Sequence, residues 1–463
     1  LADLEPAYGT GIVTRRGGGA VVGRDVADGF ELAVARADGA GRIVYRSAEH
    51  ASLLDADDRL AAISHPPDGD LLHPVVRVVD LDSGDVVAEL DDDRLGVTPI
   101  AFSPADDGRL LVSHSRHDRA GLLIWSPATG EVDEVAPELP GDVNGKWLPD
   151  ATGLLLVASL DGRDSIHRLD LATATVAALD APRGVVDAYS VRNDGTVQAL
   201  VESAAEAPRL VEIGGGPIVV FDAEPPAPSV PAESIHADGP AGPVHAFLHR
   251  PVAGTAPFPT VFAVHGGPTA QDLDAYRPLV AALVDAGYAV VRVNYRGSTG
   301  YGRDWRDALV ARLGAIEMED IGAVRAHLEA DGIVDPDRVA MIGGSWGGYM
   351  TLFALGVEPE GWAAGVALVP LADFAISQED QPAFMTAYDH VLFGGTLDEM
   401  PDAYRAASPL TYVDAVRSPV LITAGANDPR CPPRATDTYV ERLRERDHDV
   451  VYVRKDTGHA SYD

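Results

Sequence analysis

Short runs of alternating apolar and polar residues fill the first half of the chain. They extend over residues 1 to about 221, separated by Gly- and Asp-rich turns, and none of them has apolar residues at helical spacing. Strict alternation places every second side chain on one face of a strand, so it indicates strands that bury one face. Residues 1–223 are therefore predicted to form an all-β domain.

One hairpin recurs in this domain at a nearly constant interval. The clearest copies turn at Gly84, Gly130 and Ala174, which gives steps of 46 and 44 residues, and weaker copies turn near Gly39 and Gly215. A second strand pair precedes each clear copy, so one repeat holds four strands, as in a β-propeller blade. The sequence thus predicts about five blades that close into a ring, because one blade cannot bury both faces alone. A β-sandwich, the alternative, would not show this regular interval.

The composition changes after residue 223. Residues 224–231 contain four prolines in eight positions. Proline excludes a helix or strand interior, so we predict a linker over 224–242. From 243 to 463, apolar strand-like runs alternate with helical patterns, which is typical of a mostly parallel, doubly wound sheet.

A glycine-rich motif, Gly343-Gly344-Ser345-Trp346-Gly347, lies at the centre of this second half. A strand-like run over 338–342 precedes it and a helix-like run over 349–356 follows it. Strand, Gly-x-Ser-x-Gly and helix in this order form a nucleophile elbow, because glycines tolerate the tight turn that exposes the serine. The motif favours an α/β-hydrolase domain over 243–463. The alternative is a glycine-rich turn with an incidental serine.

Two further residues complete a candidate catalytic set with Ser345. A serine nucleophile needs a base, and the base needs an acid that fixes its tautomer. In α/β hydrolases the chain order is Ser, Asp or Glu, His. Asp428 and His459 follow predicted strands in this order, in loops at the same sheet edge. Asp456 and Asp373 are poorer candidates for the acid, and a turn-capping aspartate or a surface histidine is the non-catalytic alternative.

Two backbone N–H groups should meet the charge that develops on a substrate carbonyl oxygen. One is predicted to come from Trp346, next to the nucleophile. The other should come from the loop His265-Gly266-Gly267-Pro268, where glycines allow close backbone approach; we favour Gly267, with Gly266 as the second choice. His265 itself is predicted to be structural.

These motifs resemble the prolyl oligopeptidase family of serine peptidases, and within it the acylaminoacyl-peptidase-like branch. The resemblance spans the second half and is carried by residues 265–268, 294–302, 343–349, 408–409, 425–430 and 458–459. It implies an acyl-enzyme on Ser345, cleavage of short peptides, and a propeller that restricts access of folded proteins. A carboxylesterase with the same three residues and a non-catalytic propeller scaffold are the alternatives.

The resemblance also suggests how substrates would bind. An arginine two residues past the catalytic aspartate contacts a substrate carbonyl in related acylaminoacyl peptidases, and Arg430 matches it; a solvent-exposed or structural arginine is the alternative. An apolar pocket for the side chain before the scissile bond is expected near Trp346, Phe374, Phe384 and Tyr388. No metal or other cofactor motif is found, and the chemistry needs none.

Composition restricts the partners and the compartment. Lys+Arg 36 against Asp+Glu 71 gives a net charge of −35, which argues against nucleic acid or an anionic membrane as partners. Such acidity indicates either salt adaptation or a GC-rich genome. No run reaches membrane-spanning length. The one cysteine, Cys431, excludes an intrachain disulfide and mildly favours a reducing, cytoplasmic location. Formation of a homo-oligomer stays an open alternative.

Two departures from the family pattern concern the ends of the chain. Family propellers usually have seven or more blades, and their hydrolase domains continue with a helix after the histidine. Here about five blades are recognisable, and the sequence stops four residues after His459. We therefore expect a partial chain, with an incomplete propeller at the start and a missing final helix; a compact propeller and a hydrolase domain without the last helix are the alternative.

Overall fold

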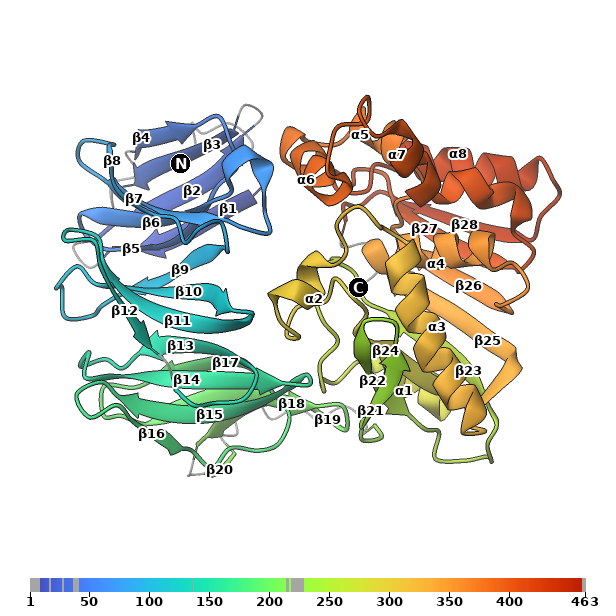
Figure 1. Ribbon diagram of the computed structural model, residues 1–463, viewed down its shortest axis with the longest axis horizontal. Helices are drawn as coiled ribbons and strands as arrows, with labels where there is room; N and C mark the ends of the chain where they lie inside the picture. Colours follow the sequence, from blue (N-terminus) through green and yellow to red (C-terminus); the bar gives the residue numbers. More distant parts are fainter. Residues whose placement is uncertain are drawn as a thin grey trace.

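The computed structural model describes residues 9–15, 18–26, 29–35, 41–135, 137–213, 216–217 and 229–459. We call the part up to residue 217 the β region and residues 229–459 the α/β region. Figure 1 shows them side by side, with five small sheets on the left and a large sheet with its helices on the right. The turns of the two weaker hairpin copies, predicted near Gly39 and Gly215, lie outside the described residues.

The β region consists of five four-stranded antiparallel sheets, each built from four consecutive strands. The first two sheets contain β1 (Gly9–Thr14), β2 (Ala20–Val26), β3 (Gly29–Ala35) and β4 (Gly41–Ser47), then β5 (Ser52–Ala56), β6 (Leu60–His65), β7 (Val75–Asp80) and β8 (Val86–Leu90). The third contains β9 (Val97–Phe102), β10 (Leu110–His117), β11 (Arg119–Ser126) and β12 (Glu131–Val135). The last two contain β13 (Asp142–Trp147), β14 (Gly153–Leu160), β15 (Arg163–Asp170) and β16 (Thr175–Ala178), then β17 (Val185–Val191), β18 (Val197–Ser203), β19 (Glu206–Glu212) and β20 (Gly216–Pro217).

Consecutive sheets pack face to face through shared apolar cores. Leu122 of the third sheet and Leu156 of the fourth belong to one buried cluster, and three similar clusters join the other neighbouring pairs. This packing explains why β14 is buried almost along its whole length, whereas an outer strand such as β16 is mostly exposed. The predicted turns at Gly84, Gly130 and Ala174 each join the last two strands of a sheet, and all three residues have positive φ.

The α/β region is organised around one eight-stranded sheet of order β21-β22-β24-β23-β25-β26-β27-β28. The pairs β21–β22 and β22–β24 are antiparallel, and all later pairs are parallel. The strands are β21 (Glu233–Gly239), β22 (Gly242–His249), β23 (Phe258–Val264), β24 (Ala289–Val293), β25 (Val334–Gly344), β26 (Ala364–Leu368), β27 (Val420–Gly425) and β28 (Val450–Lys455).

The predicted linker over 224–242 overlaps this sheet and is therefore wrong at its carboxyl boundary. Strand β21 begins at Glu233 and pairs with β22 in register from Glu233↔Leu248 to Gly239↔Gly242. Strand β21 lies at the edge of the sheet and is mostly exposed, so its residues are largely polar. This polar segment resembles a loop in the sequence. Residues 224–228, which hold most of the prolines, lie outside the described part.

Helices cover both faces of the large sheet. They are α1 (Pro278–Asp285), α2 (Arg303–Asp307), α3 (Ala315–Ala330), α4 (Trp346–Val357), α5 (Phe374–Gln378), α6 (Ala383–Phe393), α7 (Pro401–Ala407) and α8 (Pro433–Arg444). Val290 of β24 packs with Val280 and Val284 of α1, while its neighbours Val291 and Val293 belong to the main core with α3 and α4. Since successive strand residues point to opposite faces, α1 lies on one face and α3 on the other.

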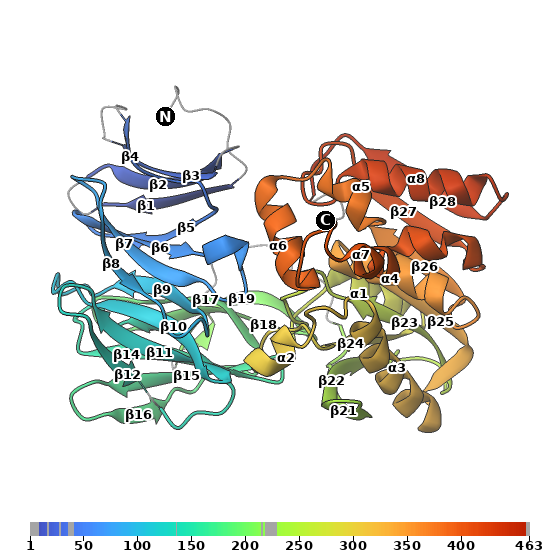
Figure 2. The ribbon, with the colours of Figure 1, turned by 45° about the horizontal axis from the view of Figure 1, so that its top comes forward.

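Contacts between the two regions gather around α2 and the loops before it. The backbone N–H of Arg303 donates to the Asp118 carbonyl at 2.7 Å, and that of Asp304 donates to the Asp118 carboxylate at 2.8 Å. Further along, Arg163 of β15 pairs with the buried Asp274 at 2.7 Å. Figure 2 shows α2 and α6 reaching from the α/β region towards the small sheets. Within the described residues, no helix combines the length and apolar character that crossing a membrane requires.

Candidate active site

Ser345 stands at the junction between β25 and α4, with φ 57° and ψ −119°. This conformation is rare for a residue with a side chain and is kept only where surrounding structure fixes it. The two motif glycines supply that structure. A Cβ on Gly343 would lie 2.4 Å from the Gly347 carbonyl carbon, and one on Gly347 would lie 2.0 Å from the Val264 oxygen. The turn therefore closes only with glycine on both sides of the serine.

Asp428 lies in the loop after β27, with its side chain completely buried. Its Oδ1 accepts hydrogen bonds from the backbone N–H groups of Arg430 and Cys431, both at 2.9 Å. These donors stabilise the ionised carboxylate and fix its orientation. A Cβ on Gly425 would lie 2.4 Å from the Gly458 oxygen, so the loop that carries Asp428 packs closely on the loop that carries His459.

His459 joins the other two residues. Its Nδ1 lies 2.8 Å from Asp428 Oδ2, and its Nε2 lies 2.9 Å from Ser345 Oγ. An ionised carboxylate can only accept, so Nδ1 carries the proton and Nε2 is free to accept from the serine hydroxyl. The structure thus brings together the three residues that the sequence proposed as nucleophile, acid and base.

The two poorer candidates for the acid are engaged elsewhere. Asp456 accepts a hydrogen bond from the Asn427 side chain at 2.8 Å. Asp373 caps the N-terminus of α5 by accepting from the Ile376 N–H at 2.9 Å. Both carboxylates therefore have structural partners.

The glycine loop after β23 lies directly against the elbow. A Cβ on Gly266 would lie 3.3 Å from Ser345 Cβ and 2.9 Å from the Gly344 oxygen, whereas Gly267 adopts a φ of +131° and turns the chain away towards Thr269. Trp346 is the first residue of α4, so its backbone N–H has no acceptor within the helix. The structure thus places Gly266 against Ser345 and Trp346, whereas the neighbours of Gly267 are Thr269 and Ala270.

His265, at the start of this loop, is held by three contacts from two neighbours. Its Nε2 lies 2.9 Å from Ser298 Oγ, its ring stacks on Tyr295 with centroids 4.4 Å apart, and the Tyr295 hydroxyl donates to its carbonyl oxygen at 2.9 Å. Burial lowers the pKa of His265, so the imidazole is neutral. These contacts fit the structural role predicted for it.

Trp346 has a side-chain partner that the sequence did not suggest. Its indole N–H donates to Glu317 Oε1 at 3.1 Å, and Glu317 lies on α3 without any exposure to solvent. Burial raises the pKa of Glu317 to about 8, so the carboxyl group is protonated at neutral pH. The helical spacing of Glu317 with the buried Ile321, Val324 and Leu328 was the signal that could have placed it in the core.

The predicted pocket residues separate into two groups. Phe374 is fully buried and packs edge-on against Trp346, with ring centroids 6.1 Å apart. Tyr388 is buried on α6; burial raises its pKa to about 12, and its hydroxyl hydrogen-bonds Thr269 of the glycine loop. Phe384, in contrast, lines a cavity between the two regions.

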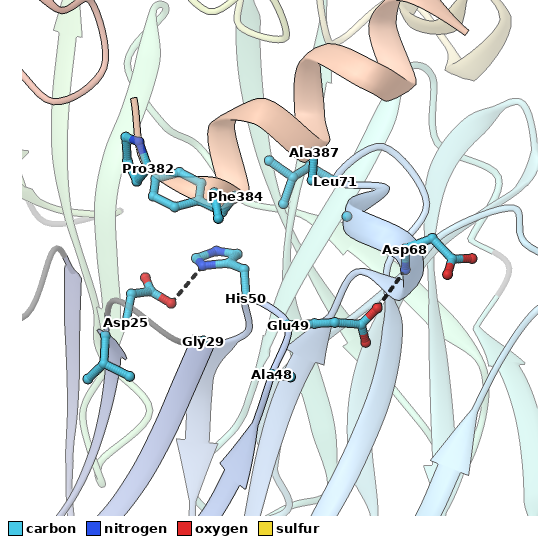
Figure 3. A pocket seen from close by; sticks show the side chains of 13 residues that line it. Asp25, Gly29, Ala48, Glu49, His50, Asp68, Leu71, Pro382, Phe384 and Ala387 are labelled. Atoms are coloured by element: carbon cyan, nitrogen blue, oxygen red, sulfur yellow. Dashed lines mark hydrogen bonds and ion pairs between the residues drawn. The ribbon is translucent and has the colours of Figure 1, made fainter. Parts of the chain in front are cut away.

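That cavity has a volume of about 570 Å³ and lies between α6 and the loops of the first two small sheets (Figure 3). Phe384 stacks on His50 of the β region with centroids 5.1 Å apart, and His50 Nδ1 lies 2.6 Å from Asp25. On the opposite wall, the backbone N–H of Asp68 donates to Glu49 at 2.9 Å. Ser345, Asp428 and His459 do not line this cavity, so Phe384 belongs to a different surface from the other three predicted pocket residues.

Arg430 and Cys431, which follow Asp428 in the same loop, also lie near the site. Arg430 is exposed, and among the described residues no carboxylate pairs with its guanidinium. Cys431 is buried, and its thiol hydrogen-bonds Ser345; burial, followed by the nearby Asp428 charge, raises the pKa of the thiol. Across the described ranges, no group of three or more His, Cys, Asp or Glu side chains is arranged to hold a metal ion.

Comparisons with known proteins identify a family domain in the α/β region. Residues 275–463 match the prolyl oligopeptidase family. The chain is 32% identical over 380 residues to dipeptidyl aminopeptidase BIII of Pseudoxanthomonas mexicana, covering 76% of this chain and 55% of that protein. It is 26% identical over 404 residues to the acylamino-acid-releasing enzyme of Homo sapiens, covering 77% of this chain and 54% of that protein. The chain therefore spans about half the length of these relatives.

Solved structures show the same likeness at the level of fold. A puromycin-hydrolyzing peptidase of Mycobacterium tuberculosis superimposes with a TM-score of 0.80 at 23% identity, over 97% of this chain and 75% of that one. This match includes the small sheets as well as the large one. Together with the sequence motifs, the family match shows that the chain carries a prolyl oligopeptidase family domain over residues 275–463.

Proposed function

We propose that the chain hydrolyses short peptides through an acyl-enzyme on Ser345. The observation that carries this proposal is the position of His459, whose two ring nitrogens lie 2.8 Å from Asp428 and 2.9 Å from Ser345. A histidine held between a buried carboxylate and a serine hydroxyl in a strained elbow is the arrangement that activates serine for attack on a carbonyl.

In the first step, Ser345 Oγ attacks the scissile carbonyl carbon while His459 Nε2 takes the hydroxyl proton. The negative charge on the substrate oxygen is stabilised by the N–H of Trp346 and by one N–H of the Gly266–Gly267 segment. The imidazolium then gives its proton to the leaving amine as the C–N bond breaks. In the second step, His459 takes a proton from water, the resulting hydroxide attacks the ester carbon, and the proton returns to Ser345 Oγ. Asp428 stabilises the imidazolium in both steps.

We further propose that the five small sheets are blades of a β-propeller and that the α/β region is an α/β-hydrolase domain. Four-stranded antiparallel sheets packed face to face in chain order support the first part. The parallel strand core, with Ser345, Asp428 and His459 in the loops after β25, β27 and β28, supports the second. A propeller in this position would limit access to the site to short, unfolded peptides.

A covalent probe tests the proposed nucleophile. A fluorophosphonate should label the wild-type protein and leave Ser345→Ala unlabelled, with Ser83→Ala as a control that keeps labelling because this exposed serine lies in the β region. Labelling that persists in Ser345→Ala would contradict the proposal. An absence of labelling in the folded wild type would favour the non-catalytic scaffold.

A substrate panel tests the reaction. We expect cleavage of aminoacyl or acylaminoacyl p-nitroanilides, and the names of the relatives suggest comparing free dipeptidyl with N-acetyl-aminoacyl substrates. Cleavage of p-nitrophenyl esters without any amide would make the chain a carboxylesterase. Arg430→Ala should raise KM for peptide substrates more than for the esters if its guanidinium contacts a substrate carbonyl.

A further inference from the structure

Cys431 is a buried nucleophilic group that the proposed reaction does not use. It lies in the loop between β27 and α8 and is 8% exposed. Its thiol hydrogen-bonds Ser345, and its backbone N–H donates to Asp428 Oδ1 at 2.9 Å. Asp428 Oδ2 lies 2.8 Å from His459 Nδ1, and His459 Nε2 lies 2.9 Å from Ser345 Oγ. Cys431 therefore closes a ring of contacts that runs through the three proposed catalytic residues.

The other contact of Ser345 Oγ decides which way the thiol hydrogen bond runs. A hydroxyl oxygen has one proton to donate and two lone pairs that accept. The proton is directed to His459 Nε2, since the proton of this imidazole is on Nδ1 and faces Asp428. The thiol must then donate its S–H to one lone pair of Oγ, and the second lone pair stays free to attack a carbonyl carbon. Burial, followed by the Asp428 charge, raises the pKa of the Cys431 thiol, so the sulfur keeps this proton at neutral pH.

A donor on Ser345 Oγ has different effects in the two halves of the reaction. During acylation Oγ is the attacking atom, and a hydrogen bond to it orients the hydroxyl but withdraws electron density. During deacylation Oγ is the leaving atom: water has added to the ester carbon, the C–Oγ bond breaks, and its electron pair goes to Oγ as His459 returns the proton. A donor already in place stabilises the negative charge that develops there. The thiol should therefore favour deacylation over acylation.

We propose that Cys431 is a further catalytic residue, whose thiol donates to Ser345 Oγ and assists the departure of this oxygen when the acyl-enzyme is hydrolysed. The proposal rests on the acyl-enzyme mechanism of the proposed function. The S–H bond persists through the cycle, and no covalent bond to sulfur forms. A thiol is a weak donor, so it leaves Oγ more nucleophilic than a hydroxyl in the same place would.

The two rates can be measured separately with p-nitrophenyl acetate. The first release of p-nitrophenol gives the acylation rate, and the decay of the acetylated protein after removal of the ester, followed by intact mass, gives the deacylation rate. In Cys431→Ala we expect deacylation to slow by roughly tenfold, less than for the loss of an oxyanion N–H because S–H is a weak donor. Acylation should change by less than about twofold. Cys431→Ser should restore deacylation and slow acylation, since its hydroxyl is a stronger donor.

Thr260→Val is the matched control for the loss of a buried polar group. Thr260 lies on β23, is fully buried, and donates its hydroxyl to the Phe258 carbonyl at 3.0 Å. Its replacement should leave both rates unchanged. Equal loss of both rates in Cys431→Ala, or an unchanged deacylation rate, would overturn the proposal. A folded wild type that forms no acetyl-enzyme on Ser345 and releases no p-nitrophenol would instead overturn the proposed function.

A measurement on the wild-type protein covers the case in which Cys431→Ala does not fold. Cys431 is the only cysteine of the chain, so methylmercury chloride has one thiol to modify. The reaction breaks the S–H bond, forms an S–Hg bond and releases the proton and chloride, which removes the donor. We expect the modified protein to lose ester hydrolysis, while Cys431→Ser is unaffected by the reagent. Full hydrolysis by a protein that carries one mercury would overturn the proposal.

Discussion

His73 of the β region and Asp307 of the α/β region form a hydrogen bond of 2.9 Å between imidazole Nε2 and the carboxylate. The other ring nitrogen lies 2.9 Å from Asp70. A histidine between two carboxylates is held in its charged form, with both ring N–H groups donating. Because Asp307 lies on α2, this charged imidazole helps to fix the orientation of the two regions (Figure 1).

This bond makes the contact between the regions sensitive to alkaline pH. Asp307 and Asp70 raise the pKa of His73 from 6.5 to about 9. The folded state therefore binds the proton more tightly, so the stabilisation is complete below pH 6.5 and is lost as pH rises through 9. We expect His73→Ala to lower the melting temperature at pH 6–7 by a few degrees, from roughly 1–2 kcal/mol after allowance for partial solvent exposure, and to have little effect at pH 10.

The exposed His117, which pairs with Glu134 inside the third sheet, provides the control. His117→Ala should change the melting temperature little at either pH, since an exposed pair contributes little. A His73→Ala effect that is the same at pH 6 and pH 10 would show that the imidazole acts through packing and not through its charge.

Glu317 should produce the opposite kind of pH dependence to an ordinary surface carboxylate. Its pKa is raised from 4.5 to about 8, so the folded state holds a proton that the unfolded state releases above pH 4.5. Stability is therefore lost as pH rises from 4.5 to 8. Glu317→Gln keeps a side-chain oxygen that accepts from the Trp346 indole N–H. The amide has no proton to release, so this pH-dependent loss of stability is absent. We expect thermal unfolding to show a gain over wild type that grows from pH 5 to pH 8, to roughly 2–4 kcal/mol.

Glu319, two residues away on α3, gives a matched comparison. Its hydrogen bond from Arg296 lowers its pKa, so its contribution is present above pH 4.5 and lost in acid. Glu319→Gln should therefore be less stable than wild type at pH 7 and close to it near pH 4. If both variants followed the same pH trend, the assignment of Glu317 as a buried neutral acid would be wrong.

The elbow glycines should tolerate no side chain. In Gly347→Ala the new Cβ would lie 2.0 Å from the Val264 oxygen, a backbone atom that cannot move without displacing β23. We expect loss of hydrolysis by at least about a hundredfold, or loss of folding, because the turn that holds Ser345 cannot close. Activity and circular dichroism on the purified variant measure both effects.

Gly322 on α3 is the corresponding control. A Cβ there meets no atom within 4 Å, and its backbone is helical. Gly322→Ala should retain full activity and gain about 0.5–1 kcal/mol of stability from helix propensity. Wild-type activity in Gly347→Ala would contradict the packing described for the elbow.

The three candidate catalytic residues could be predicted from the sequence because each lies in a short motif directly after a recognisable strand. Ser345 has a strand before it and a helix after it, and Asp428 and His459 follow apolar strands, so parallel strand order alone brings them to one edge. The repeat in the first half was visible for the same reason, since Gly84 and Gly130 occupy the same turn in successive sheets.

Features that depend on packing between distant segments could not be predicted in this way. Glu317 meets Trp346 only because α3 lies against α4, and Phe384 meets His50 only because the two regions adjoin. The edge strand β21 is too polar to stand out from a linker. Asp389 looks like an ordinary helix-surface residue in the sequence, yet it is buried on α6.

The two aspartates near His459 provide the most direct test of the catalytic assignment. Asp428 is completely buried and lies 2.8 Å from His459 Nδ1, whereas Asp456 is exposed and bonded to Asn427. Asp428→Asn would present an amide to Nδ1 and favour the tautomer that cannot accept the serine proton. We expect kcat to fall by roughly 10³–10⁴ with little change in KM. Asp456→Asn should stay within about twofold of wild type, and a larger loss for it than for Asp428→Asn would assign the acid to Asp456.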